Sequence, residues 1–104
     1  MHYDVYLAQS TDRGVAFSRP RKLSTAPSDP DGSSFNELTN EFIGDYISSV
    51  ADAARVYAVW TDARDARPCA AIDAFRAGKG PKPDVITQCP TRFGNTDIVL
   101  AIVS

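Results

Sequence analysis

A turn motif at residues 10–17 follows directly on a strand-like run at residues 4–9, and it limits this part of the chain to a hairpin. The pattern Ser-x-Asp-x-Gly-x-x-Phe is carried by Ser10, Asp12, Gly14 and Phe17. Serine and aspartate side chains bind nearby backbone N–H groups, and glycine tolerates a positive φ angle. The later aromatic side chain can fold back as a plug. The motif therefore predicts a β-hairpin that returns towards Leu23.

Three later segments have the residue pattern of β-strands, namely residues 42–50, 55–61 and 98–103. The pattern is clearest at 55–61, where apolar and aromatic side chains occupy both faces. The segment 98–103 is continuously apolar, which predicts a buried strand. Together with the hairpin, these segments predict an all-β chain.

The segments between these strands carry different signals. Residues 24–34 are dense in turn-forming residues and lack periodicity, so we expect an exposed connection there. Pro68 favours the start of a short helix with an apolar stripe that ends at Gly78. The alternating glycines and prolines of residues 78–83 predict an irregular loop.

The motif at residues 10–17 resembles the Asp-box, or bacterial neuraminidase repeat, of sialidase-like β-propellers. Arg13 stands where glycine is common in that repeat, and Phe17 replaces the more usual tryptophan. The segments 42–47 and 56–64 resemble the paired inner strands of the last blade in secreted bacterial members of the group. The resemblance implies an all-β fold built from antiparallel propeller blades.

A chain of 104 residues is too short for a complete propeller, which typically has about four to eight four-stranded blades. The resemblance therefore implies a partial β-propeller over residues 1–104, with about one and a quarter blades. Residues 1–24 would form the outer hairpin of one blade, and residues 25–40 would be the connection. Residues 41–104 would supply the inner strands of the next blade, with a disulfide-closed loop at 65–96. The remaining blades of a parent propeller, or a self-association partner, would have to cover its apolar edge.

The composition excludes several classes of partner. A net charge of −2 and a pI near 5.2 provide no basic field for nucleic acid or an anionic membrane. No apolar run approaches the roughly 20 residues of a transmembrane helix. We therefore expect neither nucleic-acid binding nor a membrane span, and no residue pattern indicates a cofactor.

Cys69 and Cys89 are the two cysteines of the sequence. Two thiols are too few for a structural zinc site, so we predict no metal site, which leaves independent buried thiols or a disulfide. Both cysteines stand where the loop leaves and rejoins adjacent strands, and such strands lie roughly 5 Å apart. This separation suits a disulfide. We therefore predict a Cys69–Cys89 bond and a secreted or extracytoplasmic location.

Four residues are candidates for ligand contact: Asp45, Tyr46, Asp62 and Arg64. In sialidase-like blades the first strand starts at the funnel face and the second returns to it. The resemblance therefore implies that Asp45 and Tyr46 converge with Asp62 and Arg64. Two interpretations remain open at this point. The carboxylates could bind backbone N–H groups while Arg64 pairs with one of them, or the group could contact a ligand.

The resemblance implies an exported, carbohydrate-directed parent related to exo-sialidases and other glycosidases, in which this segment provides scaffold and part of the funnel wall. Sialidases use an arginine triad, a tyrosine nucleophile with a glutamate partner, and an acid aspartate. Tyr46 and Arg64 match that set by residue type alone, and Glu37 and Glu41 are better explained as a solvated pair, so no catalytic residue is assigned. The alternative is a non-catalytic propeller module that binds a protein or a glycan. In either case we expect this chain alone to be inactive.

Overall fold

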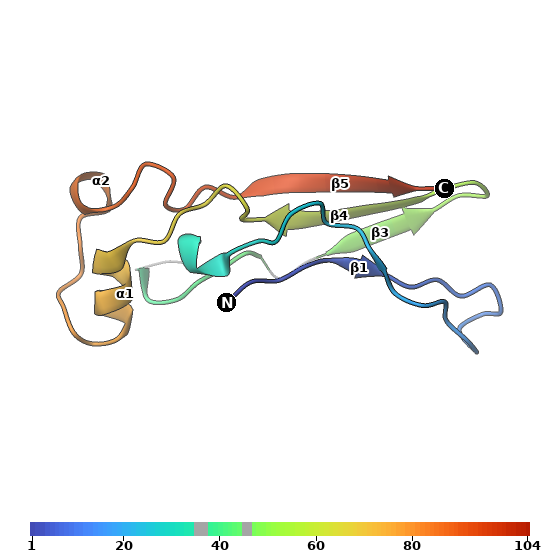
Figure 1. The fold of residues 1–104 in the computed structure, drawn as a ribbon, viewed down its shortest axis with the longest axis horizontal. Helices are drawn as coiled ribbons and strands as arrows, with labels where there is room; N and C mark the ends of the chain where they lie inside the picture. Colours follow the sequence, from blue (N-terminus) through green and yellow to red (C-terminus); the bar gives the residue numbers. More distant parts are fainter. Residues whose placement is uncertain (35–37, 45–46) are drawn as a thin grey trace.

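The computed structural model describes residues 1–34, 38–44 and 47–104, which form two antiparallel sheets and a few short helices. The strands are β1 (Tyr6–Leu7), β2 (Arg21–Lys22), β3 (Ser48–Ala51), β4 (Val56–Asp62) and β5 (Asp97–Val103). The helical elements are η1 (Pro30–Gly32), α1 (Ala70–Arg76) and α2 (Val85–Gln88). The molecule is elongated, 54 × 23 × 20 Å, with α1 and α2 at one end and the tip of the β1–β2 hairpin at the other (Figure 1). This architecture agrees with the all-β prediction.

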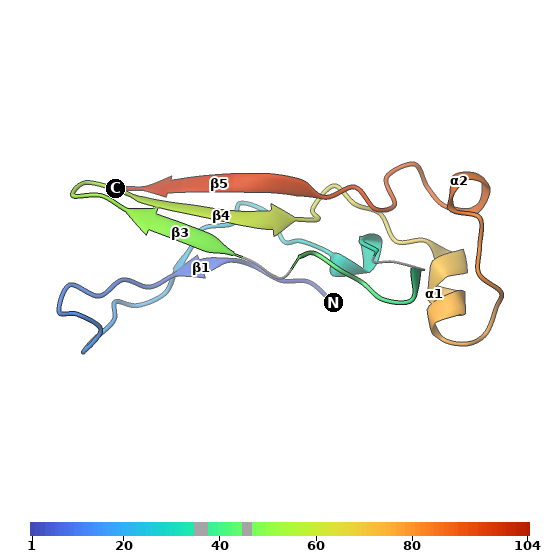
Figure 2. The same ribbon diagram turned by 180° about the vertical axis from the view of Figure 1, so that it is seen from behind.

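The larger sheet has the order β3-β4-β5, and β4 is its central strand. One face of β4 is the core of the protein, because Ala58 and Trp60 are only 5% and 4% exposed. The N-terminal segment lies along this face, where the Tyr3 hydroxyl donates a hydrogen bond to the Thr61 carbonyl at 2.8 Å. Figure 2, which views the molecule from behind, shows that β1 runs beside the larger sheet. The strand predicted at residues 55–61 is therefore confirmed as β4. The rest of the fold packs around it.

The predicted β1–β2 hairpin is confirmed, but its regular ladder is short. It pairs Tyr6 with Lys22 and Leu7 with Arg21. The predicted role of Phe17 as a plug is wrong, because the hairpin tip projects beyond the larger sheet and leaves this side chain 66% exposed (Figure 1).

Two strand predictions differ from the structure in extent or burial. Within the described residues the strand expected at 42–50 is regular only from Ser48, after Gly44 adopts a φ angle of +97°. The strand expected at 98–103 is confirmed in position but is not buried, since Ile98 is 72% exposed and Leu100 is 55% exposed. Its outward side chains remain in solvent because only one face of the sheet is covered.

The connection at residues 24–34 is irregular apart from the single turn of η1, and it is not exposed throughout as predicted. Ser28 and Ser33 are 1% and 0% exposed, because their hydroxyl groups replace the partners that an irregular backbone lacks. The Ser33 hydroxyl donates to the Pro30 carbonyl at 2.6 Å and accepts the Phe42 N–H at 2.9 Å. The turn-forming residues thus predicted the lack of long regular elements in this segment correctly, but they predicted its exposure incorrectly.

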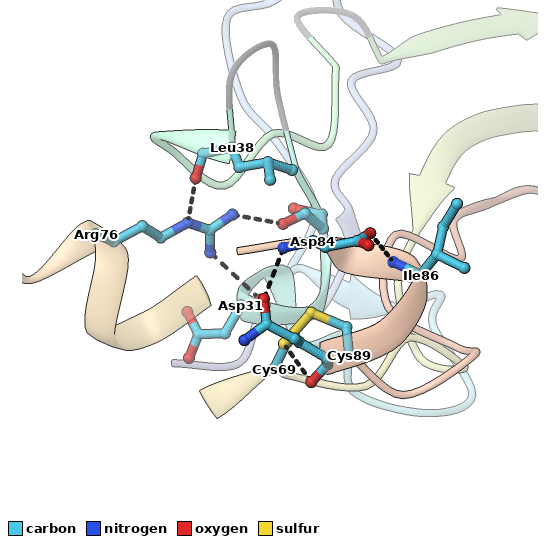
Figure 3. Close-up of a disulfide and its surroundings, with 9 residues drawn as sticks. Asp31, Leu38, Cys69, Arg76, Asp84, Ile86 and Cys89 are labelled. Atoms are coloured by element: carbon cyan, nitrogen blue, oxygen red, sulfur yellow. Dashed lines mark hydrogen bonds between the residues drawn. A yellow bond between two sulfur atoms is a disulfide. The ribbon is translucent and has the colours of Figure 1, made fainter. Parts of the chain in front are cut away.

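The predicted Cys69–Cys89 disulfide is present, with a Cα–Cα distance of 5.1 Å (Figure 3). The helix expected between Pro68 and Gly78 is α1, and Gly78 ends it with a φ angle of +70°. The second helix, α2, was not predicted. Its cap is Asp84, whose carboxylate accepts the Ile86 N–H at 3.0 Å.

Arg76, at the end of α1, holds the disulfide-closed loop against the connection between the two sheets. Its guanidinium donates to the carbonyl oxygens of Ser33 at 2.9 Å and Asn40 at 3.1 Å. It also donates to the Leu38 carbonyl at 3.2 Å, as Figure 3 shows. Its side chain is only 10% exposed, so these hydrogen bonds give a largely buried guanidinium the acceptors that it requires. None of the helices within the described ranges has the length and apolar character of a transmembrane span.

Candidate functional site

Asp62 and Arg64 form a bidentate ion pair at the end of β4. The Arg64 Nε atom lies 2.9 Å from one carboxylate oxygen, and Nη2 lies 2.8 Å from the other. The Arg64 backbone N–H also donates to this carboxylate at 2.8 Å. The Asp62 side chain is 1% exposed and the Arg64 side chain 25%, so the guanidinium is the part of the pair that meets solvent.

Side chains from distant parts of the chain complete this cluster. The Trp60 indole N–H donates to Asp62 at 3.3 Å, and Arg64 Nη1 donates to the Thr25 hydroxyl at 2.7 Å. The Ser28 hydroxyl accepts the Ala63 N–H at 3.2 Å, just beside the pair. The cluster therefore joins the end of β4 to the connection that follows β2.

The electrostatics of the cluster keep both partners ionised. The hydrogen bonds from Arg64 hold the pKa of Asp62 well below its ordinary value, even though burial of the carboxyl opposes this effect. Hydrogen bonding to Asp62 correspondingly raises the pKa of the Arg64 guanidinium. A carboxylate with such a low pKa cannot act as a proton donor near neutral pH, so its chemical role here is to orient the guanidinium.

An apolar cavity of about 250 Å³ opens beside this cluster. Its lining residues come from the N-terminal segment, the approach to β3 and the end of β4: Tyr3, Val5, Ile43, Gly44, Ile47, Trp60 and Thr61. Burial is the main reason that the pKa of the Tyr3 hydroxyl is raised, so Tyr3 is a neutral hydrogen-bonding group at the cavity wall. Trp60 connects the cavity with Asp62 through its indole N–H.

The structure brings two of the four predicted ligand residues together, Asp62 and Arg64. Asp45 and Tyr46 lie outside the described residues, as does Glu37. Glu41 is near a cation, with its carboxylate 3.6 Å from Arg76 Nη1.

Sequence analysis missed three members of the site, namely Tyr3, Thr25 and Ser28. Each reaches the end of β4 across 35 to 58 residues of chain. No periodicity or motif marks them, because a hydroxyl in a turn-rich segment has the same local pattern whether it binds a buried group or water.

Within residues 1–34, 38–44 and 47–104, no three His, Cys, Asp or Glu side chains gather as a metal site would require. A scan against protein-family models, a search of curated proteins and a search of solved structures each found no match.

Proposed function

We propose that this chain is a partial blade of an exported sialidase-like β-propeller, in which it provides scaffold and part of the wall of a carbohydrate-binding funnel. The turn at residues 10–17 is the observation that supports this most directly. The Ser10 hydroxyl accepts the Gly14 N–H at 2.8 Å, and the Asp12 carboxylate accepts the Ala16 N–H at 2.9 Å. The serine, aspartate and glycine of the motif thus lock a turn between antiparallel strands, the role that an Asp-box would have.

The uneven covering of the β3-β4-β5 sheet favours a blade. One face is packed against the N-terminal segment, whereas the other exposes Ile98, Leu100 and Ile102 by 55% or more. A propeller blade lies between two neighbouring blades and is apolar on both faces. The exposed face therefore fits a sheet whose second neighbour is another part of a larger assembly.

The Asp62–Arg64 pair is the proposed point of ligand contact. Of the five N–H donors of a guanidinium, three of those on Arg64 bind Asp62 and Thr25. One N–H on each terminal nitrogen is left to meet a ligand oxygen or water, and Asp62 fixes the plane in which they point. We propose that these two N–H groups donate to the carboxylate of an acidic sugar, because hydrogen bonds to a charged carboxylate are stronger than those to a neutral hydroxyl.

The disulfide supports an exported protein. Disulfides persist in oxidising compartments and are rare where glutathione keeps thiols reduced. The Cys69–Cys89 bond is therefore compatible with a secreted or extracytoplasmic location.

Titration with sialyllactose, followed by NMR of the ¹⁵N-labelled chain, tests the carbohydrate proposal. We expect shifts of backbone amides at Gly44 and at residues 61–64, and much smaller shifts with lactose, which lacks the carboxylate. Equal responses to both sugars would exclude recognition of the carboxylate by Arg64. No response to either at millimolar concentration would contradict a carbohydrate ligand and favour the alternative, a non-catalytic module that binds a protein.

An assay with a chromogenic sialoside tests whether this chain is catalytic by itself. We expect no turnover, because a propeller gathers its catalytic residues from several blades around the ring. Turnover above that of an Arg64→Ala variant would contradict the interpretation as a partial blade.

A further inference from the structure

The tip of the β1–β2 hairpin holds two apolar side chains in solvent. Val15 is 85% exposed and Phe17 is 66% exposed. The turn that carries them is fixed by side-chain bonds, because the Ser10 hydroxyl accepts the Gly14 N–H and the Asp12 carboxylate accepts an N–H across the turn. In Figures 1 and 2 the tip stands clear of the larger sheet and of the helices. Within the part of the chain that the structure describes, nothing buries these two side chains.

Three arginines lie on this tip and directly beside it. Arg13 is part of the turn, and Arg19 and Arg21 follow on the returning strand. All three are exposed, and among the described residues their guanidiniums form no hydrogen bond or ion pair. Asp12 is the one acidic residue between positions 9 and 22, and the backbone of the turn already occupies its carboxylate. The tip therefore combines an apolar apex with an excess of unpaired positive charge.

The net charge of −2 belongs to the whole chain and hides this local excess. Lys22, the next basic residue of the hairpin, adds little to it, because it pairs with Asp4 at 2.9 Å. The β3–β4 turn lies at the same end, where it lines a cavity together with Gln9, and the charges of its Asp52 and Arg55 cancel. The average charge therefore predicted no basic field for an anionic membrane, but the hairpin tip provides a small one.

We propose that the hairpin tip binds the surface of an anionic phospholipid bilayer, with Val15 and Phe17 in the headgroup region and the three arginines on lipid phosphates. Anionic lipid is complementary in charge to the arginines, and a guanidinium can donate two parallel hydrogen bonds to one phosphate. The interfacial region of a bilayer accepts the apolar side chains of a convex element, whereas a protein partner would need a pocket of matching shape. Charge and shape together therefore favour a membrane surface over an acidic protein.

Neither part of the tip is enough to hold the protein on a membrane by itself. Two apolar side chains bury little area, and the attraction of three exposed charges is screened by salt. We therefore expect a weak, reversible attachment that requires anionic lipid and low ionic strength. The inference rests on the exposed side chains of the tip and not on the propeller proposal, in which the same turn has only a structural role.

Flotation of the whole chain with phospholipid vesicles tests the proposal. One set of vesicles is phosphatidylcholine with about one third phosphatidylglycerol, and the other is phosphatidylcholine alone. We expect binding to the anionic set only, with a bound fraction that falls as NaCl rises from about 0.05 M to 0.5 M. Phe17→Trp adds a direct probe, because its emission should shift to the blue on anionic vesicles. The native Trp60 is only 4% exposed, so it should contribute a constant background.

Two variants separate the apolar and the basic parts of the tip. Phe17→Ser should weaken vesicle binding about tenfold and leave its salt dependence unchanged, because it removes apolar area and no charge. The Arg19→Gln, Arg21→Gln double variant should weaken binding roughly fivefold for each arginine removed and flatten the salt dependence.

Matched controls lie at the opposite end of the molecule. Ile86→Ser removes an apolar side chain that is 91% exposed on α2, and the Lys79→Gln, Arg92→Gln double variant removes two exposed positive charges. Both should bind vesicles as the wild type does. Circular dichroism and an intact disulfide establish that each variant is folded.

Three results would overturn the proposal: no binding to anionic vesicles, equal binding to both sets, or binding that the hairpin variants leave unchanged. Absence of vesicle binding together with retention on immobilised poly-glutamate would instead indicate an acidic protein partner. The glycan titration reports on Arg64 at the end of β4, so either proposal can fail without the other.

Discussion

Arg64 binds both carboxylate oxygens of Asp62, at 2.9 and 2.8 Å, although only one residue separates them in the sequence. The pair would be an ordinary surface contact if Asp62 were exposed, but its side chain is 1% accessible. Arg64 also binds Thr25, 39 residues earlier in the chain. This one guanidinium therefore both neutralises a buried charge and ties the end of β4 to the preceding connection.

Removal of the Arg64 guanidinium should destabilise the protein. Arg64→Ala leaves a buried carboxylate without its cation, and we expect a loss of about 2 kcal/mol in the free energy of unfolding. This is below the cost of breaking a fully buried pair, because water can reach the site that Arg64 vacates. Urea denaturation measures the difference, and Arg21→Ala, on the exposed strand β2, is the matched control. Equal midpoints for the two variants would show that the pair contributes little.

The pair should also make stability depend on pH. The folded pKa of Asp62 lies well below its ordinary value of 3.8, so the unfolded chain takes up a proton at a higher pH than the folded chain does. The stabilisation by this group is therefore complete above pH 3.8 and is lost as the pH falls from there towards the folded pKa. Melting temperatures of the wild type and Asp62→Asn should differ most near pH 6, and the difference should narrow steadily as the pH falls below 3.8. A constant difference across this range would exclude Asp62 as the titrating group.

The hairpin turn should stabilise only its own residues and contribute little to the stability of the core. Asp12→Ala removes the acceptor of the Ala16 N–H, at a tip where Phe17 is 66% exposed. We expect faster hydrogen exchange at residues 13–17 with little change in the midpoint of global unfolding. Val15→Ala, at an 85% exposed position of the same turn, should change neither. A large shift of the global midpoint in Asp12→Ala would mean that the turn is packed in solution against something else.

Those parts of the fold that depend on local pattern could be predicted from the sequence. Residues 56–62 form β4 because both faces carry strand-favouring side chains, and α1 lies between a proline and a glycine that limit it. The disulfide could be predicted because Cys69 and Cys89 lie at the two ends of one loop.

The parts that could not be predicted depend on contacts between distant residues. Nothing local distinguishes Arg76 from a solvated arginine, yet it binds carbonyl groups 36 to 45 residues earlier in the chain. The prediction that β5 is buried was wrong for the same reason. An uninterrupted apolar strand predicts burial, but burial requires a covering element, and the described chain covers only one face of the sheet. The Asp62–Arg64 pair lies between these cases, since its spacing permitted two interpretations and only the geometry shows the contact.

Loss of the disulfide should loosen one end of the molecule and spare the other. Cys69 and Cys89 are 20 residues apart, and a bond that closes a loop of this size contributes about 3 kcal/mol by restricting the unfolded chain. The helices α1 and α2 have only seven and four residues, and helices this short do not persist without tertiary support such as the disulfide provides.

The Cys69→Ser, Cys89→Ser double variant should therefore unfold at lower urea concentration. Its amide protection should fall first in residues 70–88, while the β4–β5 ladder keeps its protection. Arg76 and the bond from the Gly94 N–H to the Gly32 carbonyl at 2.7 Å would then be among the contacts that still hold this end, so adding Arg76→Met to the double variant should lower its protection further, whereas Arg76→Met alone should have a smaller effect. Uniform loss of protection across β4, β5 and the helices would instead mean that the loop and the sheet unfold as one unit.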